Sequence, residues 1–419
     1  MKLNYKQTFL IGFGFFASSV AWAMYNTYVP KLLEQYLAST LLIGAVMTVD
    51  NIFGVIFQPL FGAISDKTQT RFGRRMPYIL IGLPVCAAAF SLIPFTWSLP
   101  TLMGVVILFN FVMSTWRAPV VAFMPDITPS PLRSQANGII NFMGGVGSLI
   151  SFFLGGILFK LGGMPLPFIT SAAIMLLALV MLMLFVNEEK MRIQPEAAEE
   201  TRKEEVSQEE KTSQKKSLLF LLFAILFWFT GYNAVETFFS LYVTNTLKDA
   251  GGQFLDAGDA AMLLAMYSLT FLICAIPAGI LGTRIGRRKT ILIGLAGVTI
   301  IFAGLLFTSN LWVLRILLLL GGAFWACVNI NSLPMVVELA PWKDIGKFTG
   351  YYYFFSFSAA IISPILYGWI RDVVQNYQSL FIYSAAAFFI AILCMTFVKH
   401  GEARPIKQSA SEILENLDS

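Results

Sequence analysis

The sequence has few charged residues, and it lacks the residue types from which most catalytic and metal sites are built. Only 13% of its 419 residues are charged, against about 25% in a typical soluble protein. The one histidine, His400, follows the last apolar segment, so a histidine metal site or a serine–histidine catalytic pair has no basis. We therefore expect no enzyme, no metal and no other cofactor.

Cysteines are also scarce, and no strand precedes a glycine-rich nucleotide loop. The four cysteines lie singly within apolar segments, without the spacing of a metal site or a disulfide framework: Cys86, Cys274, Cys327 and Cys394. We expect them to pack as small apolar residues. Nothing in the sequence indicates a nucleic-acid partner.

Long apolar segments are abundant instead, and they set the fold class. Hydrophobic residues make up 57% of the chain, in stretches of about 20 residues, which suffice for a helix to cross a hydrocarbon core about 30 Å thick. The alternation typical of membrane β-barrel strands is absent. The sequence predicts an all-α membrane protein with twelve transmembrane helices, over residues 8–29, 41–64, 77–97, 101–124, 136–159, 166–186, 218–244, 260–282, 290–308, 312–336, 348–370 and 379–398.

The spans fall into two groups of six around a polar segment. Residues 188–217 are highly charged and nearly free of large apolar side chains, which is typical of a flexible or surface linker. We expect an N-terminal half over 1–187, a cytoplasmic linker over 188–217, a C-terminal half over 218–398 and a cytoplasmic tail over 399–419. The first apolar run has no cleavage site, so we interpret it as a retained span.

The distribution of basic residues predicts the orientation. If both termini and the linker share one side, that side holds 23 Lys and Arg residues and the opposite side holds 4. Basic residues accumulate in cytoplasmic loops. We therefore expect a multi-pass protein of the cell membrane with both termini in the cytoplasm.

Two loop patterns recur in both halves. GAISDKTQTRFGRRMP (62–77) follows the second span, and GILGTRIGRRKT (279–290) follows the eighth. APVVAFMPDITPSPLRSQANG (118–138) and LPMVVELAPWKDIGKFTG (333–350) follow the fourth span of each half. The offsets of about 212–217 residues indicate an internal duplication. Two similar halves around a site at mid-depth are typical of alternating-access transporters.

The first repeated loop resembles the loop between spans two and three of the major facilitator superfamily, which reads Gly-x-x-x-Asp-Arg/Lys-x-Gly-Arg/Lys-Arg/Lys. The matching residues here, with TQTR inserted, are Gly62, Asp66, Lys67, Gly73, Arg74 and Arg75. The second copy, in which Thr283 replaces the Asp, matches at Gly279, Arg284, Gly286, Arg287 and Arg288. The resemblance implies the major facilitator fold and transport.

A narrower resemblance points to sugar symporters. QPLFGAISDKTQTRFGRRMPYI is similar to the glycoside–cation symporters and to the sucrose–proton symporters, and Arg117, Ala118 and Asp126 match the fourth-span pattern of the sucrose-type group. The resemblance implies cation-coupled sugar uptake. Gly54 and Gln58 stand where melibiose-type members carry two carboxylates, so we do not expect their sodium site. The first span lacks the acid that many sucrose-type members have.

Three ionisable residues inside the spans are the candidates for proton coupling: Asp50, Arg117 and Glu236. An acid at the centre of a span costs about 2.5–3.5 kcal/mol on insertion scales, and desolvation favours its neutral form, so Asp50 or Glu236 can exchange a proton. A buried Arg117 needs a partner, and Asp50 is the candidate. Structural hydrogen bonding by Asp50, gate capping by Glu236 and snorkelling by Arg117 are the alternatives.

The candidate substrate-binding residues combine aromatic rings that can stack on a sugar, amides that can bond to hydroxyls, and the ionisable residues. They are Trp22, Tyr25, Asn26, Asp50, Asn51, Gln58, Asn110, Arg117, Asn233, Glu236, Trp325, Asn329 and Asn331. For each aromatic residue alone, packing or contact with lipid is the alternative.

The basic loops predict a cytoplasmic gate. Asp66 can accept hydrogen bonds at a helix N-terminus of the other half, or pair with nearby arginines. Such contacts would form in one state and break in the other, and the alternative is that the loops serve topology alone. The candidate gating residues are Asp66, Arg71, Gly73, Arg74, Arg75, Asp126, Arg133, Arg284, Arg287, Arg288 and Glu338.

The sequence therefore predicts a monomeric secondary active transporter that works by alternating access in the lipid bilayer. The favoured activity is symport of protons with a sugar or glycoside, preferably a disaccharide. A proton-coupled exporter of drugs or metabolites is the rival, and a membrane sensor without transport is a more distant alternative.

Overall fold

A computed structural model describes residues 4–128, 133–191, 208–308, 310–340 and 345–402. In these ranges the chain is helical, with one isolated bridge between Lys248 and Phe254. The helices are α1 (Tyr5–Glu34), α2 (Thr40–Met47), α3 (Val49–Lys67), α4 (Met76–Leu92), the 3-10 helix η1 (Ile93–Phe95), α5 (Leu99–Ile127), α6 (Arg133–Gly162), α7 (Pro165–Phe185), α8 (Glu188–Met191), α9 (Gln208–Thr246), α10 (Ala257–Ile285), α11 (Arg287–Leu305), α12 (Leu311–Glu338), α13 (Ile345–Val374) and α14 (Ser379–Thr396).

Twelve spans in the described part are long and apolar enough to cross a bilayer, which confirms the predicted fold class. α2 and α3 together form the second span, Thr40–Lys67, and α4 with η1 forms the third, Met76–Phe95. The structure differs from the expected boundaries at the seventh span, because α9 begins at Gln208, inside the segment expected to be linker. Its mixed-charge first turns carry no apolar signal, so hydropathy alone starts the span too late.

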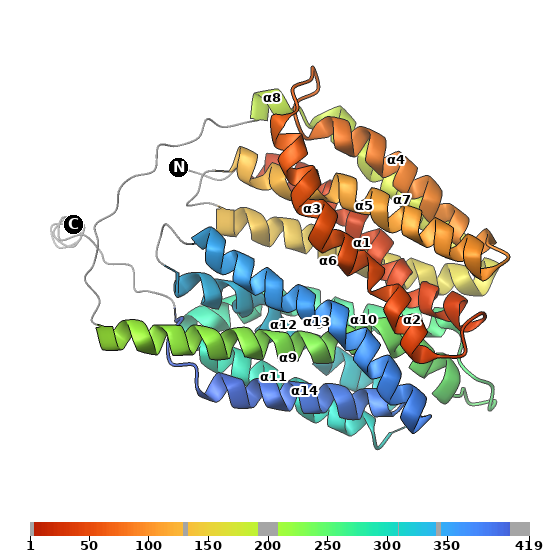
Figure 1. Ribbon diagram of the computed structural model, residues 1–419. Coiled ribbons are helices and arrows are strands. Elements are labelled where there is room, and N and C mark those ends of the chain that lie inside the picture. Colours follow the sequence, from red (N-terminus) through yellow and green to blue (C-terminus); the bar gives the residue numbers. More distant parts are fainter. Residues whose placement is uncertain (1–3, 129–132, 192–207, 309, 341–344, 403–419) are drawn as a thin grey trace, which may run out of the picture.

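The helices are arranged in two bundles that lie against each other. Figure 1 shows α1 to α7 in red to yellow above α9 to α14 in green to blue, with the long helices running in roughly the same direction. In each bundle the helix ends that carry the repeated basic loops lie on one side, here named the loop end. The opposite side, where α1, α6, α9 and α13 have their C-terminal ends, is named the latched end.

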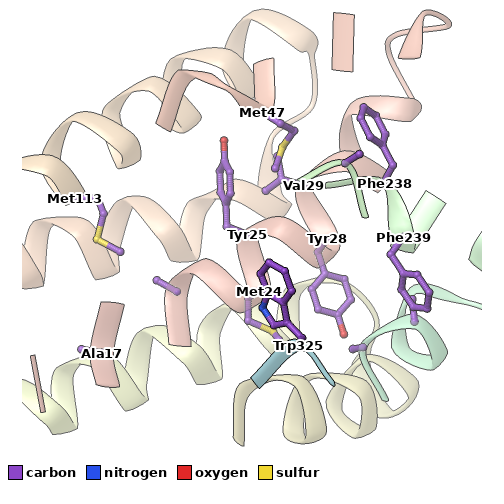
Figure 2. Packing of buried hydrophobic residues seen from close by; sticks show 14 of the residues in the cluster. Ala17, Met24, Tyr25, Tyr28, Val29, Met47, Met113, Phe238, Phe239 and Trp325 are labelled. Atoms are coloured by element: carbon purple, nitrogen blue, oxygen red, sulfur yellow. The ribbon is translucent and has the colours of Figure 1, made fainter. Parts of the chain in front are cut away.

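Buried aromatic and aliphatic side chains from both bundles surround α1. Tyr25, Tyr28 and Val29 of α1 are fully buried, and so are Phe238 and Phe239 of α9. Figure 2 shows the rings of Tyr25 and Tyr28 leaving α1 in opposite directions. Burying one such aromatic side chain stabilises a fold by about 1.5–3 kcal/mol where the surroundings would otherwise be water. α1 therefore positions polar side chains near both bundles.

At the latched end the two bundles approach through paired glycines. Gly156 of α6 faces Gly258 of α10, so that a Cβ added to either would lie 2.8 Å from the carbonyl oxygen of the other. Gly44 of α2 packs in the same way on Pro364 of α13, and Gly368 on Thr40. Small residues let membrane helices approach this closely. The two crossings are equivalent, because Gly44 and Gly258 differ by 214 positions and Gly156 and Gly368 by 212.

Polar contacts fasten each crossing. Asp372, in the last turn of α13, accepts hydrogen bonds from the Ser39 hydroxyl (2.6 Å) and from the backbone N–H groups of Thr40 (2.8 Å) and Leu41 (3.0 Å) at the start of α2. On the other side Lys160 of α6 pairs with Asp259 of α10. Asp372 thus caps a helix of the opposite half, where a carboxylate is stabilised by the helix N-terminus.

Between the two crossings, Glu34 at the end of α1 adds a further tie. Its carboxylate accepts from the Asn245 amide of α9 (2.7 Å) and from the Tyr377 hydroxyl (3.3 Å) that precedes α14. Lys31 pairs with the same carboxylate at 2.6 Å. The described polar contacts between the halves at this end therefore involve α1, α2 and α6 of the first half and α9, α10 and α13 of the second.

We expect Asp372→Ala to part the halves at the latched end, because α2 loses a cap made of three hydrogen bonds to a charged group. Spin labels on the exposed residues Trp97 and Phe307, in a background without native cysteines, report the separation of the two bundles there. We expect the loss of the cap to cost the closed latched end at least about 1.4 kcal/mol, so the population at the longer distance should rise at least about tenfold.

The matched control for this substitution is Asp249→Ala. Asp249 lies at the same end and accepts from the backbone of Gly251 and Gln253 in its own loop, so its loss should leave the distances unchanged. Equal effects of the two substitutions would contradict the assignment of a latch to Asp372.

Candidate functional site

The second membrane span is interrupted beside its acidic residue. α2 and α3 meet at Thr48, whose hydroxyl donates to the Ala45 carbonyl (2.8 Å), while the backbone N–H of Asn51 donates to the Asp50 carboxylate (2.6 Å). Interrupted helices at mid-depth turn their polar ends toward bound ions or substrates. The break thus places Asp50 in the first turn of α3, where a helix N-terminus stabilises negative charge.

Asp50, Arg117 and Glu236, from α3, α5 and α9, form a group here named the central cluster. Asp50 interacts electrostatically with both Arg117 and Glu236, and all three side chains are partly accessible. At a rise of 1.5 Å per residue, Asp50 and Glu236 each lie about 15 Å from the latched ends of their spans. The structure therefore brings the three residues predicted for proton coupling together from both halves.

Glu236 is tied to the opposite half by a hydrogen bond. The Asn26 amide nitrogen of α1 donates to its Oε1 atom at 3.1 Å. Tyr232 of α9 and Tyr267 of α10 also interact electrostatically with this carboxylate. Asn26, expected to bind substrate hydroxyls, thus already has a carboxylate partner in this structure.

An aromatic pair flanks the central cluster in each half. In the first half Trp22 of α1 contacts Phe109 of α5 edge-on, with ring centroids 5.8 Å apart, and lies 5.8 Å from the Arg117 guanidinium. In the second half Tyr232 stacks on Trp325 of α12, with centroids 4.5 Å apart and an interplanar angle of 2°. Phe109 and Trp325 are buried, whereas Trp22 and Tyr232 are half-buried. Trp22 and Tyr232 are therefore the members of the two pairs that could stack on a ring-shaped ligand.

The remaining predicted binding residues differ in how they use their polar atoms. Tyr25 accepts a hydrogen bond from the Asn110 amide (3.1 Å), and both are buried beside Asp50. Asn331 donates to the carbonyls of Ala278 (3.1 Å) and Cys327 (3.0 Å), which ties α12 to α10. This arrangement favours a packing role for Asn331.

The other four amide side chains lie on the helices of the site. The Asn51 amide donates to the carboxylate of its neighbour Asp50 at 2.7 Å. Asn233 donates to the Phe229 carbonyl within α9 at 2.7 Å. Gln58 lies two turns after Asp50 on α3, against Gly54, and Asn329 lies two residues before Asn331 on α12. Gln58 and Asn329 remain candidates from the sequence.

At the loop end of the first half, Arg75 organises the predicted gating residues. Its side chain is 3% exposed and pairs with Asp66 and with Asp126, the latter at 2.9 Å from Nε, and also donates to the Gly62 carbonyl (3.1 Å). Arg74 pairs with Asp126 as well. Asp66 therefore adopts the second of its expected roles here, pairing with an arginine of its own half.

Glu188 caps the helix that follows this loop. Its carboxylate, in α8, accepts from the backbone N–H groups of Arg74 (2.9 Å), Arg75 (2.9 Å) and Met76 (3.0 Å) at the start of α4. Gly73 precedes them with φ of +101°, and a Cβ there would overlap the Glu188 side chain. Successive backbone N–H groups in such a turn form an anion-binding nest.

The second half repeats this cap with Glu402. Its carboxylate accepts from the backbone N–H groups of Arg287 (2.5 Å) and Arg288 (3.0 Å) at the start of α11, after Gly286 with φ of +97°. Arg287 also pairs with Glu338 at 3.1 Å. Sequence reasoning missed Glu188 and Glu402, although each is an acid shortly after the last span of its half.

Two further gating candidates, Arg71 and Arg284, take no part in the ion pairs of the described residues. The Arg71 guanidinium lies 4.7 Å from the Phe72 ring, and Arg284 is exposed near the end of α10. The side chain of Arg133 lies outside the described part of the structure. The described ion pairs of the two loops each join residues of one half.

These features define the class of the protein. Two six-span halves that lie around a charged cluster and are fastened to each other at one end are the architecture of a membrane transporter. The chain belongs to the Major Facilitator Superfamily, whose family model matches residues 11–258 and 247–416. The family identified from the loop motifs is therefore confirmed.

The related proteins divide between sugar transport and drug resistance. Mouse Proton-associated sugar transporter A is 29% identical over 157 residues, 34% of this chain and 21% of that protein, so the match spans about a fifth of its length. The Isoprimeverose transporter of Lactiplantibacillus pentosus is 23% identical over 360 residues, 78% of this chain and 71% of that one. The Multidrug resistance protein MdtG of Proteus mirabilis (strain HI4320) is 22% identical over 405 residues, 93% and 95% of the two chains.

Solved structures agree on the fold. A crystal structure of the nucleoside transporter NupG superposes with a TM-score of 0.69 at 15% identity, covering 94% of this chain and 100% of that chain. At this identity the likeness concerns the fold alone.

We expect Gly73→Ala to lower the thermal stability of the purified protein. A side chain at this positive φ is strained and would displace the Glu188 cap, at a combined cost of about 1–3 kcal/mol. Gly104→Ala is the matched control, since a Cβ at Gly104, within helix α5, meets nothing within 4 Å. A melting temperature that is unchanged in Gly73→Ala would show that the cap contributes nothing.

Proposed function

We propose that the protein is a proton-coupled symporter that imports a sugar or glycoside, with a disaccharide as the favoured substrate. The observation that carries the proposal is the central cluster, in which carboxylates from opposite halves lie together at mid-depth and one of them, Asp50, also interacts with Arg117. Ionisable groups in such a position cost free energy unless function requires them. They are retained here because charge has to arrive and leave as the halves move.

Charge counting supports a role for Glu236 as the proton carrier. With Asp50 and Glu236 ionised and Arg117 protonated, the central cluster holds a net charge of −1, and one bound proton makes it neutral. Arg117 interacts with Asp50, whereas the described neighbours of Glu236 are an amide, two phenols and Asp50. The proton therefore binds at Glu236, and Asp50 stays ionised near Arg117.

The aromatic pairs and the relatives support a sugar as the cargo. The half-buried rings of Trp22, near Arg117, and of Tyr232, near Glu236, can stack on a sugar. The amides and carboxylates of the site can bond to its hydroxyls. Two of the relatives carry sugar transport in their names.

The orientation follows from the basic loops. The loop end faces the cytoplasm in this proposal, because it carries the repeated basic segments, and both termini lie on that side of the cell membrane. The described structure then corresponds to a state fastened at its outer, latched end. Transport proceeds by rocking of the halves about the central cluster, and a single chain contains the whole site.

Drug or metabolite export is the second candidate. It is favoured by the likeness to a multidrug resistance protein over 93% of this chain. The same charged cluster serves antiport, in which protons enter as the cargo leaves.

Uptake into proteoliposomes tests the proposal. With the lumen at pH 7.5 and the outside at pH 5.5, the wild type should accumulate radiolabelled sucrose or maltose. Glu236→Gln should lower accumulation at least about tenfold while keeping exchange of labelled for unlabelled sugar, because exchange needs no net proton movement. Glu189→Gln, a change at an exposed carboxyl outside the site, is the control.

Two outcomes would contradict symport. Accumulation that persists in Glu236→Gln and in Asp50→Asn would remove proton coupling through the central cluster. If neither sugar moves and energised vesicles instead expel ethidium, the protein is an exporter.

A further inference from the structure

We propose that Asn26 is a positioning residue that makes Glu236 release its proton when the latched end is closed. The inference deepens the proposed function and rests on it, since it concerns the same proton-binding carboxyl. It assigns to Asn26 a role other than the sugar binding expected from the sequence.

Asn26 and Glu236 form a direct hydrogen bond between the two halves. Asn26 belongs to α1 and Glu236 to α9, and the amide Nδ2 atom donates to the carboxyl Oε1 atom at 3.1 Å. An amide nitrogen can only donate, and a hydrogen bond to an ionised acceptor is roughly twice as strong as one between neutral groups. The contact therefore favours the ionised form of Glu236 over the protonated form.

The other groups around Glu236 act in the opposite sense or are neutral. Tyr232 of its own helix and Tyr267 of α10 are phenols that interact with it electrostatically. Asp50 of α3 carries a negative charge that opposes ionisation of Glu236, and the positive charge of Arg117 is shared with Asp50. Among these described neighbours, Asn26 is the group that stabilises the carboxylate by a direct hydrogen bond.

The location of the bond links it to the movement of the halves. It crosses from one half to the other, about 12 Å from the end of α1 at Glu34, where the latch contacts lie. Rocking apart at the latched end separates α1 from α9 and breaks it. Closure of the latched end favours the ionised form of Glu236 through this bond. Because coupling between two equilibria is reciprocal, ionisation of Glu236 in turn favours closure of the latched end.

The consequence for the cycle is directional. When the latched end closes behind an incoming proton, Asn26 meets Glu236 and the proton leaves toward the loop end. When the latched end is open, the amide is withdrawn and Glu236 binds a proton more readily. The same contact therefore promotes release of the proton and stabilises the closed latched end once the proton has left.

The test measures conformation against pH in the absence of sugar. Spin labels at Trp97 and Phe307 report the latched end of purified protein in nanodiscs. In the wild type, the population ratio of the long to the short distance should rise about fivefold between pH 8.5 and pH 5.5. Protonation of Glu236 replaces a charged hydrogen bond by a weaker neutral one, and the difference in strength sets this factor. Asn26→Leu, which removes the donor at similar size, should reduce the change to less than about twofold.

Two further variants separate this role from simple loss of folding. Asn26→Asp combined with Glu236→Gln exchanges the amide and the carboxylate between the halves, so the pH response should return, while Glu236→Gln alone should lack it. Asn141→Leu removes an amide that bonds within α6 to the Asn137 carbonyl at 2.8 Å, and it should respond like the wild type.

A full pH response in Asn26→Leu, or a response that is lost in Asp50→Asn but kept in Asn26→Leu, would overturn the inference. Because no sugar is present, these results are independent of the substrate. Failure of sugar uptake with an intact Asn26-dependent response would instead reject the proposed cargo alone.

Discussion

The structure depends on how three charges are kept at mid-depth in a medium that solvates charge poorly. Asp50 and Arg117 come from the first half and Glu236 from the second, so their mutual attraction and repulsion act across the surface where the halves meet. A single added proton changes the net charge of this group from −1 to zero. The electrostatic energy of the cluster thus depends on the relative position of the halves. Every contact that fixes the halves, from the paired glycines to the Asp372 cap, therefore affects the energy of protonating the cluster.

The duplication explains both the likeness and the difference of the halves. Gly73 with Glu188 and Gly286 with Glu402 build the same capped turn at the loop end. The backbone needs of the fold are therefore met twice in the same way. The side chains that face the centre diverge: an interrupted helix with Asp50 on one side, and Glu236 beside the stacked Tyr232 and Trp325 on the other.

The family, the twelve spans and the three central ionisable residues could be predicted from the sequence, because hydropathy and isolated charges act locally along the chain. The interruption at Thr48 could not be predicted, because VMTVDNI contains neither glycine nor proline and so gives no signal of a break within the span. Neither could the Asn26–Glu236 bond or the Glu188 cap, which join residues 210 and 112 to 114 positions apart, respectively. Such pairings follow from helix packing, for which the sequence carries no local signal.

The joint at Thr48 has a mechanical consequence. α2 is bound to the second half by the Asp372 cap, whereas α3 packs on α5 of its own half. The two parts of one membrane span thus contact different halves of the protein, and the break between them at Thr48 lies two residues before Asp50. Motion of the halves would bend the span at Thr48 and rotate the first turn of α3, so that movement at the latched end reaches the Asp50 carboxylate as a rotation of its own backbone.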